Sequence, residues 1–473
     1  NISKVKVGVW VTSGNLTVNM GEIKDVQTGI TMSGSGRLVV NSGAKITFEG
    51  AGHGVKVGGT AMANLTSMTI RGGGATGTGV VMEGTEMMTM TEVGISGVQT
   101  GIQVTSGNLT VNGGSMTGVQ TGITMLGSGM LVVRDRTRIE FTSGAGNYGI
   151  EVGNGANADI TGVEIKGGGK GGQGMGVYVQ SGASATLTNV NISEVGKGVW
   201  MDGTGEMTME RVDILNVEKG VEATAGTLVI KGGTTLQMTN VDVLNVGVGV
   251  EAKKGGTLTI KEGSIGFKKD YGIGVWGKAT ATITGTTIRG EGSGKGVYAT
   301  GVGKLTLTMT GVNISNVGEG VNATNGTVTI KDGSIGFTSG ANNYGIGVGN
   351  GVTMATVTGT RITGGGQGTG VLMMETKMMR LDGVTISNVG EGVWVKGTLV
   401  MDKGSITVTG NGVKGYGMGV YVGKEATATI TGTTIRGAGM GSKGVVMNGK
   451  TLGMSGVTIK DVAIGVEVTG GIL

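Results

Sequence analysis

The stretch Gly320-Val-Asn-Ala-Thr-Asn-Gly-Thr-Val-Thr-Ile-Lys-Asp-Gly-Ser-Ile-Gly-Phe337 decides the fold of this chain of 473 residues. Apolar residues alternate there with polar ones in short runs, which glycine interrupts. A period of two is typical of β-strands with one buried face, and the interruptions indicate turns between short strands. The residues that we expect to point into a core are Val321, Ala323, Val328, Ile330 and Ile335.

The same unit recurs along the whole sequence and nearly always opens with Gly followed by Val or Ile. The openings recur about every 24 residues, which suits a coil of three short strands and three turns. Parallel strands in such a coil connect in the right-handed sense. We therefore predict an all-β fold, a right-handed parallel β-helix (β-solenoid) of about twenty coils, formed by residues 1–473 as a single domain. We interpret its glycines as turn residues. The opening glycines are Gly8, Gly29, Gly54, Gly79, Gly101, Gly122, Gly149, Gly176, Gly198, Gly220, Gly249, Gly274, Gly296, Gly320, Gly347, Gly370, Gly392, Gly419, Gly444 and Gly465.

The composition excludes several classes of protein. The chain has 37 Lys and Arg against 32 Asp and Glu, a mild excess that does not indicate nucleic acid binding. We interpret the short basic runs at 134–138, 253–254 and 268–269 as solvated turns, with contact to heparin-like polymers or acidic lipids as the alternative. No apolar stretch is long enough for a membrane helix, and the first residues of the sequence do not resemble a signal peptide. We expect that export and anchoring segments were removed.

One class of aromatic residues directly follows the opening Gly-Val pair, as Trp10 does. Because the Val faces inward, alternation places the next side chain on the outer face. Aromatics then pair on successive coils, with Glu222 and Glu251 between the first two pairs. They form either a binding strip for a protein or a sugar chain, or a stack that only stabilises the sheet. The candidate partner-binding pairs are Tyr178 over Trp200, Trp276 over Tyr298, and Trp394 over Tyr421.

The other aromatics fall into two classes that we interpret as loop anchors. Four Phe residues end the last strand of a coil, and four Tyr residues precede a following Gly-Val or Gly-Ile unit. The single His of the chain takes the Tyr place in an early coil, which gives it a structural role. These residues are Phe48, Phe141, Phe267 and Phe337, then Tyr148, Tyr271, Tyr344 and Tyr416, and finally His53.

The residues that carry chemistry are scattered. With no Cys and one His, the chain has neither a Cys-His pair nor zinc-ligand spacing. Acidic residues occur singly, although stacking could bring Asp332 near Glu262, which have matching places in their coils. Most of the 27 Met replace Leu, Ile or Val of neighbouring coils, which indicates flexible core filler. We therefore predict no catalytic residue, no metal site and no cofactor.

The segment from Gly296 to Val321, Gly-Val-Tyr-Ala-Thr-Gly-Val-Gly-Lys-Leu-Thr-Leu-Thr-Met-Thr-Gly-Val-Asn-Ile-Ser-Asn-Val-Gly-Glu-Gly-Val, resembles passenger domains of Bartonella autotransporters. So does Thr284-Gly-Thr-Thr-Ile-Arg-Gly290. The resemblance implies export through a C-terminal translocator β-barrel, which we expect to be absent from residues 1–473, and a secreted or cell-surface location. An angiogenic member of that family is an agonist of the vascular endothelial growth factor (VEGF) receptor.

Three functions follow as hypotheses. The first is a non-enzymatic virulence factor that binds a host endothelial receptor of the VEGF-receptor type and stimulates proliferation. The second is a surface adhesin that binds host matrix or glycans, including heparin-like polymers. The third is a glycan-cleaving β-helix enzyme. We expect a monomer with no membrane span and no nucleic acid partner.

Overall fold

The computed structural model describes the chain except for residues 75, 169–172, 181, 225–234, 240–241, 411 and 413–414. The side chains at 235–239, 242–245, 375, 376 and 440 also lie outside the described part. The chain divides into two compact units, Asn1–Leu244 (unit 1) and Asn245–Leu473 (unit 2). Each unit is described by itself, and the single domain stays a prediction.

The regular elements of the described residues are all β-strands. Those of unit 1 are β1 (Ile2–Val11), β2 (Leu16–Asn19), β3 (Glu22–Met32), β4 (Ser35–Asn41), β5 (Lys45–Val57), β6 (Thr60–Thr66), β7 (Thr69–Gly72), β8 (Thr78–Met82), β9 (Met87–Thr91), β10 (Gly94–Ser96), β11 (Thr100–Val104), β12 (Asn108–Asn112), β13 (Ser115–Val119), β14 (Thr121–Met125), β15 (Met130–Arg134), β16 (Arg138–Phe141), β17 (Tyr148–Val152), β18 (Asn157–Thr161), β19 (Glu164–Lys166), β20 (Met175–Val179), β21 (Ser184–Thr188), β22 (Asn191–Ser193), β23 (Lys197–Asp202), β24 (Glu206–Glu210), β25 (Asp213–Leu215), β26 (Lys219–Thr224) and β27 (Thr235–Thr239).

The boundary between the units falls inside β28 (Asp242–Val246). The strands of unit 2 are β29 (Val248–Ala252), β30 (Thr257–Lys261), β31 (Ser264–Phe267), β32 (Tyr271–Trp276), β33 (Thr280–Thr284), β34 (Thr287–Arg289), β35 (Lys295–Thr300), β36 (Thr306–Thr310), β37 (Asn313–Val317), β38 (Glu319–Lys331), β39 (Ser334–Phe337), β40 (Tyr344–Thr358), β41 (Arg361–Thr363), β42 (Thr369–Val389), β43 (Glu391–Val408), β44 (Gly417–Val422), β45 (Thr427–Met447), β46 (Thr451–Ser455) and β47 (Thr458–Val468).

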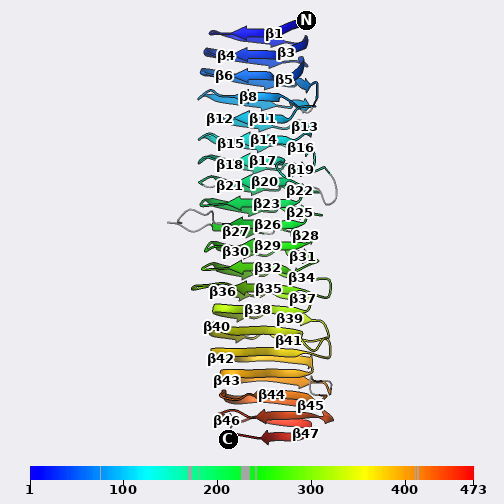
Figure 1. Ribbon diagram of the computed structural model, residues 1–473, viewed down its shortest axis with the longest axis vertical. Helices are drawn as coiled ribbons and strands as arrows, with labels where there is room; N and C mark the ends of the chain where they lie inside the picture. The colour runs from blue at the N-terminus through cyan, green and yellow to red at the C-terminus, as the bar shows by residue number, and fades with distance from the viewer. Residues whose placement is uncertain are drawn as a thin grey trace. The chain divides into compact units, whose positions relative to one another are not determined.

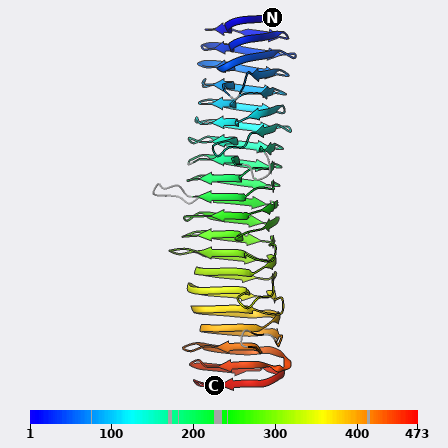
Figure 2. The same cartoon turned by 45° about the vertical axis from the view of Figure 1, so that its right-hand side comes forward.

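Each turn of the chain contributes a first, a second and a third strand, as β17, β18 and β19 do. Each of these pairs in parallel with its equivalent one turn later, which is β20, β21 or β22. In both views the strands of each unit lie in layers, one turn above the next (Figures 1 and 2). In the described part of the chain the turns recur about every 24 residues, which confirms the predicted β-solenoid.

The core of each unit consists of ladders of apolar side chains. In unit 1, Ile123, Ile150 and Val177 occupy one register position on successive first strands and are fully buried. All five residues predicted to point inward in the repeat at 320–337 are at most 2% exposed. Buried Met side chains fill equivalent places, since Met209 aligns with Leu187. The predicted use of Met as core filler is thereby confirmed for these positions, whereas others such as Met87 are exposed.

The opening glycines lie inside the first strands, so their interpretation as turn residues is wrong. A Cβ atom on Gly198 would lie 2.5 Å from Ile214 Cγ2 and 2.6 Å from the carbonyl oxygen of Gly220 in the next turn. These positions face the core where successive backbones approach too closely for any side chain. The register also moves two predicted openings back by two residues, to Gly272 and Gly345, since Ile273 and Ile346 hold the ladder positions.

The four Phe residues anchor the loops that follow the third strands, as predicted. Each ring is buried and lies against a glycine of the next turn. A Cβ on Gly174 would be 2.9 Å from the ring of Phe141, and one on Gly368 would be 2.9 Å from the ring of Phe337. Both glycines have positive φ angles. The loop therefore closes over the aromatic ring with a residue that has no side chain.

Candidate functional site: aromatic stacks on the first strands

The outer face of the first strands carries the predicted aromatic strip. In unit 1, four successive turns place Glu151, Tyr178, Trp200 and Glu222 at one outward register position. Their spacing is that of paired parallel strands, about 4.8 Å. A second outward column lies three residues earlier in each strand and begins with Tyr148.

The unit 1 stack consists of Tyr148, Tyr178 and Trp200. The Tyr148 and Tyr178 ring centroids are 5.2 Å apart with an interplanar angle of 22°, and those of Tyr178 and Trp200 are 4.8 Å apart at 20°. Tyr178 is therefore covered on both faces. Desolvation by burial raises the pKa of the Tyr148 and Tyr178 hydroxyls. Tyr148 begins β17 and extends the stack, so its interpretation as a loop anchor is wrong.

Charged side chains cover the free end of this stack. Lys197 Nζ lies 3.9 Å from the centroid of the Trp200 ring, a cation–π contact. The same ammonium is 3.0 Å from Glu222 Oε2, and Lys219 Nζ is 3.6 Å from it. Glu222 is only 5% exposed, and the two lysines compensate its burial. The predicted place of Glu222 beside the aromatic pair is confirmed.

The first unit 2 stack has a different register from the predicted one. Gly274 aligns with Tyr298, and Trp276 aligns with Thr300, so Trp276 does not lie directly over Tyr298. Their rings still meet edge to face, with centroids 6.0 Å apart at 88°. Tyr271 completes the stack, 5.0 Å from Trp276 at 68°. Its hydroxyl donates a hydrogen bond to Glu251, which is 2% exposed.

Glycine makes room for these rings. A Cβ on Gly274 would lie 2.2 Å from the Trp276 ring, because that ring turns back across the strand. Gly347 has the same role for Tyr344, whose ring would be 2.4 Å from a Cβ there. Tyr271 and Tyr344 thus begin first strands and pack on their outer faces, so the loop-anchor interpretation is wrong for both.

Tyr344 is the most deeply buried of the tyrosines and joins a polar network. Its hydroxyl donates to Glu319 Oε2 at 2.7 Å and accepts from Asn322 Nδ2 at 2.6 Å. Lys295 Nζ lies 3.2 Å from the other carboxylate oxygen of Glu319. Burial, and then the carboxylate of Glu319, raise the pKa of the Tyr344 hydroxyl well above its ordinary value.

This raised pKa predicts an alkaline loss of stability. In the unfolded chain Tyr344 loses its proton near pH ~10, whereas in the fold it remains protonated, so the free energy of unfolding falls as pH rises above that value. We expect the melting temperature to fall between about pH 9 and 11.5, followed by circular dichroism. The fall should be smaller in Tyr344→Phe, which has no proton to lose. Equal falls in both proteins would contradict this assignment.

The second unit 2 stack pairs Trp394 with Tyr421 as predicted. The two residues are direct register partners, and their ring centroids are 4.2 Å apart at 37°. Both rings are partly exposed. Of the predicted class, only Trp10 is highly exposed, at 69%, and it has Thr31 as its register partner. The structure therefore assembles the six candidate residues into three stacks and leaves Trp10 outside them.

His53 has the structural environment that the sequence indicates. It lies within β5, where its Nε2 is 3.2 Å from Thr31 Oγ1 of the preceding turn. Desolvation by burial, followed by the charge of Lys56, lowers the pKa of the imidazole.

The described residues contain no group of three or more His, Cys, Asp or Glu that could hold a metal ion. Glu262 and Asp332 each lie in the turn between a second and a third strand. The equivalent turns at Gly285 and Gly311 lie between them. Glu262 and Asp332 are therefore three turns apart, roughly 14 Å, and the predicted proximity is wrong.

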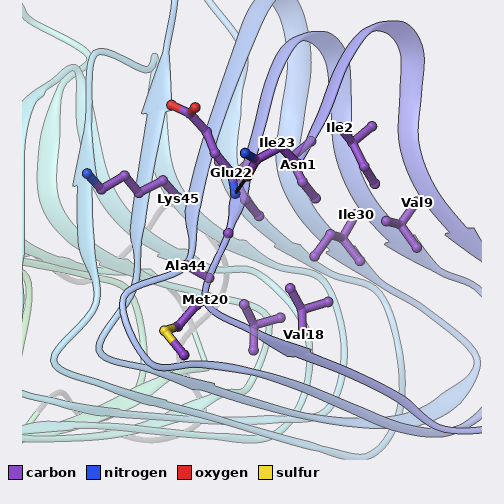
Figure 3. Close-up of a pocket in the computed structure, with 13 residues that line it drawn as sticks. Asn1, Ile2, Val9, Val18, Met20, Glu22, Ile23, Ile30, Ala44 and Lys45 are labelled. Atoms are coloured by element: carbon purple, nitrogen blue, oxygen red, sulfur yellow. Dashed lines mark hydrogen bonds between the residues drawn. The ribbon is translucent and has the colours of Figure 1, made fainter.

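One pocket opens at the first turns of unit 1. Apolar side chains of β1 and β3, among them Val9, Ile23 and Ile30, line it, and Glu22 and Lys45 extend away from these side chains (Figure 3). It exposes the apolar interior of the coil. The ionisable side chains that line it are Glu22 and Lys45.

A comparison with known protein families matches residues 121–288 and 295–459 to a family described as the right-handed beta helix region. The chain belongs to the right-handed β-helix family. The predicted handedness is thereby confirmed. No helix among the described residues is long and apolar enough to cross a membrane.

Other comparisons add little about this β-helix. No curated protein matches its sequence. Among solved structures, a chain in the cryo-EM structure of the Vag8–C1 inhibitor complex is similar, with 11% identity, 97% of this chain and 99% of that chain covered, and a TM-score of 0.33. A likeness of that degree carries no argument about partners. The candidate site therefore depends on the geometry of this β-helix alone.

Proposed function

We propose that this β-helix is the exported passenger of an autotransporter of the Bartonella type and that it acts, without catalysis, by binding a host cell-surface protein. The observation that supports binding is the grouping of partly exposed Trp and Tyr side chains with Lys and Glu on one strand face. In protein interfaces, rigid aromatic side chains surrounded by polar residues contribute most of the binding energy.

The ring geometry favours a protein partner over a sugar chain. A pyranose stacks on the open face of an aromatic ring, but both faces of Tyr178 are covered, and Lys197 lies over Trp200. Ring edges and hydroxyl groups remain for a partner, and these suit side chains and backbone of a protein surface. If the chain is an adhesin that binds glycans, we expect the glycans to bind to other parts of the surface.

The specific partner that we propose is a receptor of the VEGF-receptor type on endothelial cells, whose stimulation leads to proliferation. The resemblance of the segment from Gly296 to Val321 to the Bartonella passengers supports this choice. The passenger would act as a monomer, either released or displayed on the bacterial surface. The test is to apply the purified chain to endothelial cells and measure receptor phosphorylation. An absence of receptor phosphorylation at a saturating dose would exclude the proposed agonist activity.

Substitution of two tryptophans separates a binding role from a structural one. We expect Trp200→Ser with Trp276→Ser to weaken binding to endothelial cells by at least about 30-fold, as the loss of interface hot spots does. The matched control is Trp10→Ser, which removes a more exposed Trp outside the stacks and should leave binding unchanged. Flow cytometry with labelled protein measures both.

The outcomes decide between the hypotheses. If the double variant folds and binds like the parent, the stacks only stabilise the sheet. Binding to immobilised matrix or glycans without receptor phosphorylation would indicate the adhesin, and release of cleaved sugars in a glycan screen would indicate the enzyme. A thermal melt of each variant shows whether lost binding comes from lost structure.

A further inference from the structure

A row of lysines follows the turn between the first and second strands of unit 2. The turn after β29 carries Lys253 and Lys254, and the turns after β32 and β35 carry one lysine each. The next two equivalent positions, at 324–326 and 349–353, carry none, and the four after them carry one lysine each. The side chains of all but Lys253 are exposed. We name these seven exposed residues the lysine row: Lys254, Lys278 and Lys304, then Lys377, Lys396, Lys424 and Lys450.

Contacts between successive turns establish that the first three lysines of the row lie side by side. A Cβ on Gly277, next to Lys278, would be 3.6 Å from the Cα of Lys254. A Cβ on Gly303, next to Lys304, would be 2.6 Å from Lys278 Cγ. The flanking strands pair in parallel, so these three turns repeat the charge at steps of about 4.8 Å.

The first three charges of the row are not neutralised. Within the part of the chain that the structure describes, no carboxylate lies within 4.0 Å of Lys254, Lys278 or Lys304. By contrast, Lys450 pairs with Glu425 at 2.5 Å. Like charges at this spacing repel one another, which gives the row no benefit for folding.

Unit 1 provides an internal comparison. Its described turns between first and second strands, at 12–15, 33–34, 58–59, 83–86, 105–107, 126–129, 153–156 and 203–205, contain neither Lys nor Arg. The turn at 83–86 instead carries Glu83 and Glu86. In unit 1 the equivalent turns between first and second strands therefore form without basic residues, so the fold does not require the lysine row.

We propose that the lysine row binds a linear sulfated polysaccharide. The file of flexible ammonium groups at Lys254, Lys278 and Lys304, with its short and regular spacing, complements a chain of regularly spaced anions. Aromatic side chains are absent from these turns, so they offer no platform on which nucleic acid bases could stack. The row borders the aromatic stacks but is a different surface, and its ligand does not depend on the proposed receptor.

The test uses heparin as the probe, with chemically desulfated heparin and single-stranded DNA as comparison polymers. We expect the triple variant Lys254→Gln, Lys278→Gln, Lys304→Gln to bind heparin about 100-fold more weakly than the parent. The control triple Lys261→Gln, Lys331→Gln, Lys460→Gln removes the same charge from exposed lysines outside the row and should change the Kd less than about 3-fold.

Surface plasmon resonance at several salt concentrations measures these constants. The affinity of the parent for heparin should fall as the salt concentration rises, and the affinity of the row variant should fall less steeply. The proposal is overturned if the parent does not bind heparin, if both triples lose affinity equally, or if desulfated heparin or DNA binds as tightly as heparin. Receptor phosphorylation in the row variant, measured separately, distinguishes failure of this proposal from failure of the receptor proposal.

Discussion

Replacing Ile330 by Asp is expected to lower the free energy of unfolding by about 5 kcal/mol. Ile330 is 2% exposed and lies in a ladder between Met309 and Val357, its register partners in the turns before and after. Apolar side chains above and below leave no partner for a carboxylate there. The substitution therefore buries an uncompensated charge and removes apolar contacts in two neighbouring turns.

Urea unfolding followed by circular dichroism measures this loss. The control is Thr329→Asp, one residue earlier, where the side chain points outward between Thr308 and Thr356. We expect this change to cost less than about 1 kcal/mol. The loss in Ile330→Asp should also shrink near pH ~3.5, since protonation removes the buried charge. Equal midpoints for the two variants would contradict the inward direction of Ile330.

Replacing Gly320 by Ala is expected to destabilise unit 2 by about 3 kcal/mol, although it adds only a methyl group. The new Cβ would lie 2.2 Å from Ile335 Cγ2 and 2.3 Å from the carbonyl oxygen of Gly345. The carbonyl belongs to the backbone of the next turn, which is held by strand pairing and cannot move freely. Relief of the clash therefore separates two paired strands.

Gly465 offers a matched control for this substitution. It occupies the same place in β47, but a Cβ there would meet nothing within 4 Å. Gly465→Ala should leave the melting temperature unchanged or raise it slightly, because Ala restricts the unfolded chain. A melting temperature of Gly320→Ala equal to that of Gly465→Ala would show that the turns can separate without cost.

The β-helix, its coil length and its inward residues could be predicted from the amino-acid sequence. The reason is that short strands with a period of two recur in a unit of about 24 residues. Stacking these units as a coil of parallel strands buries the apolar face of every strand. Val321, Ala323 and Ile335 could be named in advance because alternation alone fixes their direction. The aromatic positions on the outer face followed from the same alternation, as Trp394 over Tyr421 illustrates.

Features that depend on contacts between turns could not be predicted in this way and became visible in the three-dimensional structure. The register placed Gly274, and not Trp276, opposite Tyr298, because the order of residues within one strand does not reveal how the next strand aligns with it. Tyr148 joined a stack for the same reason. The demand for glycine at Gly198 arises partly from an atom of the next turn, the carbonyl oxygen of Gly220, and the distance between turns is a property of packing that no single strand contains.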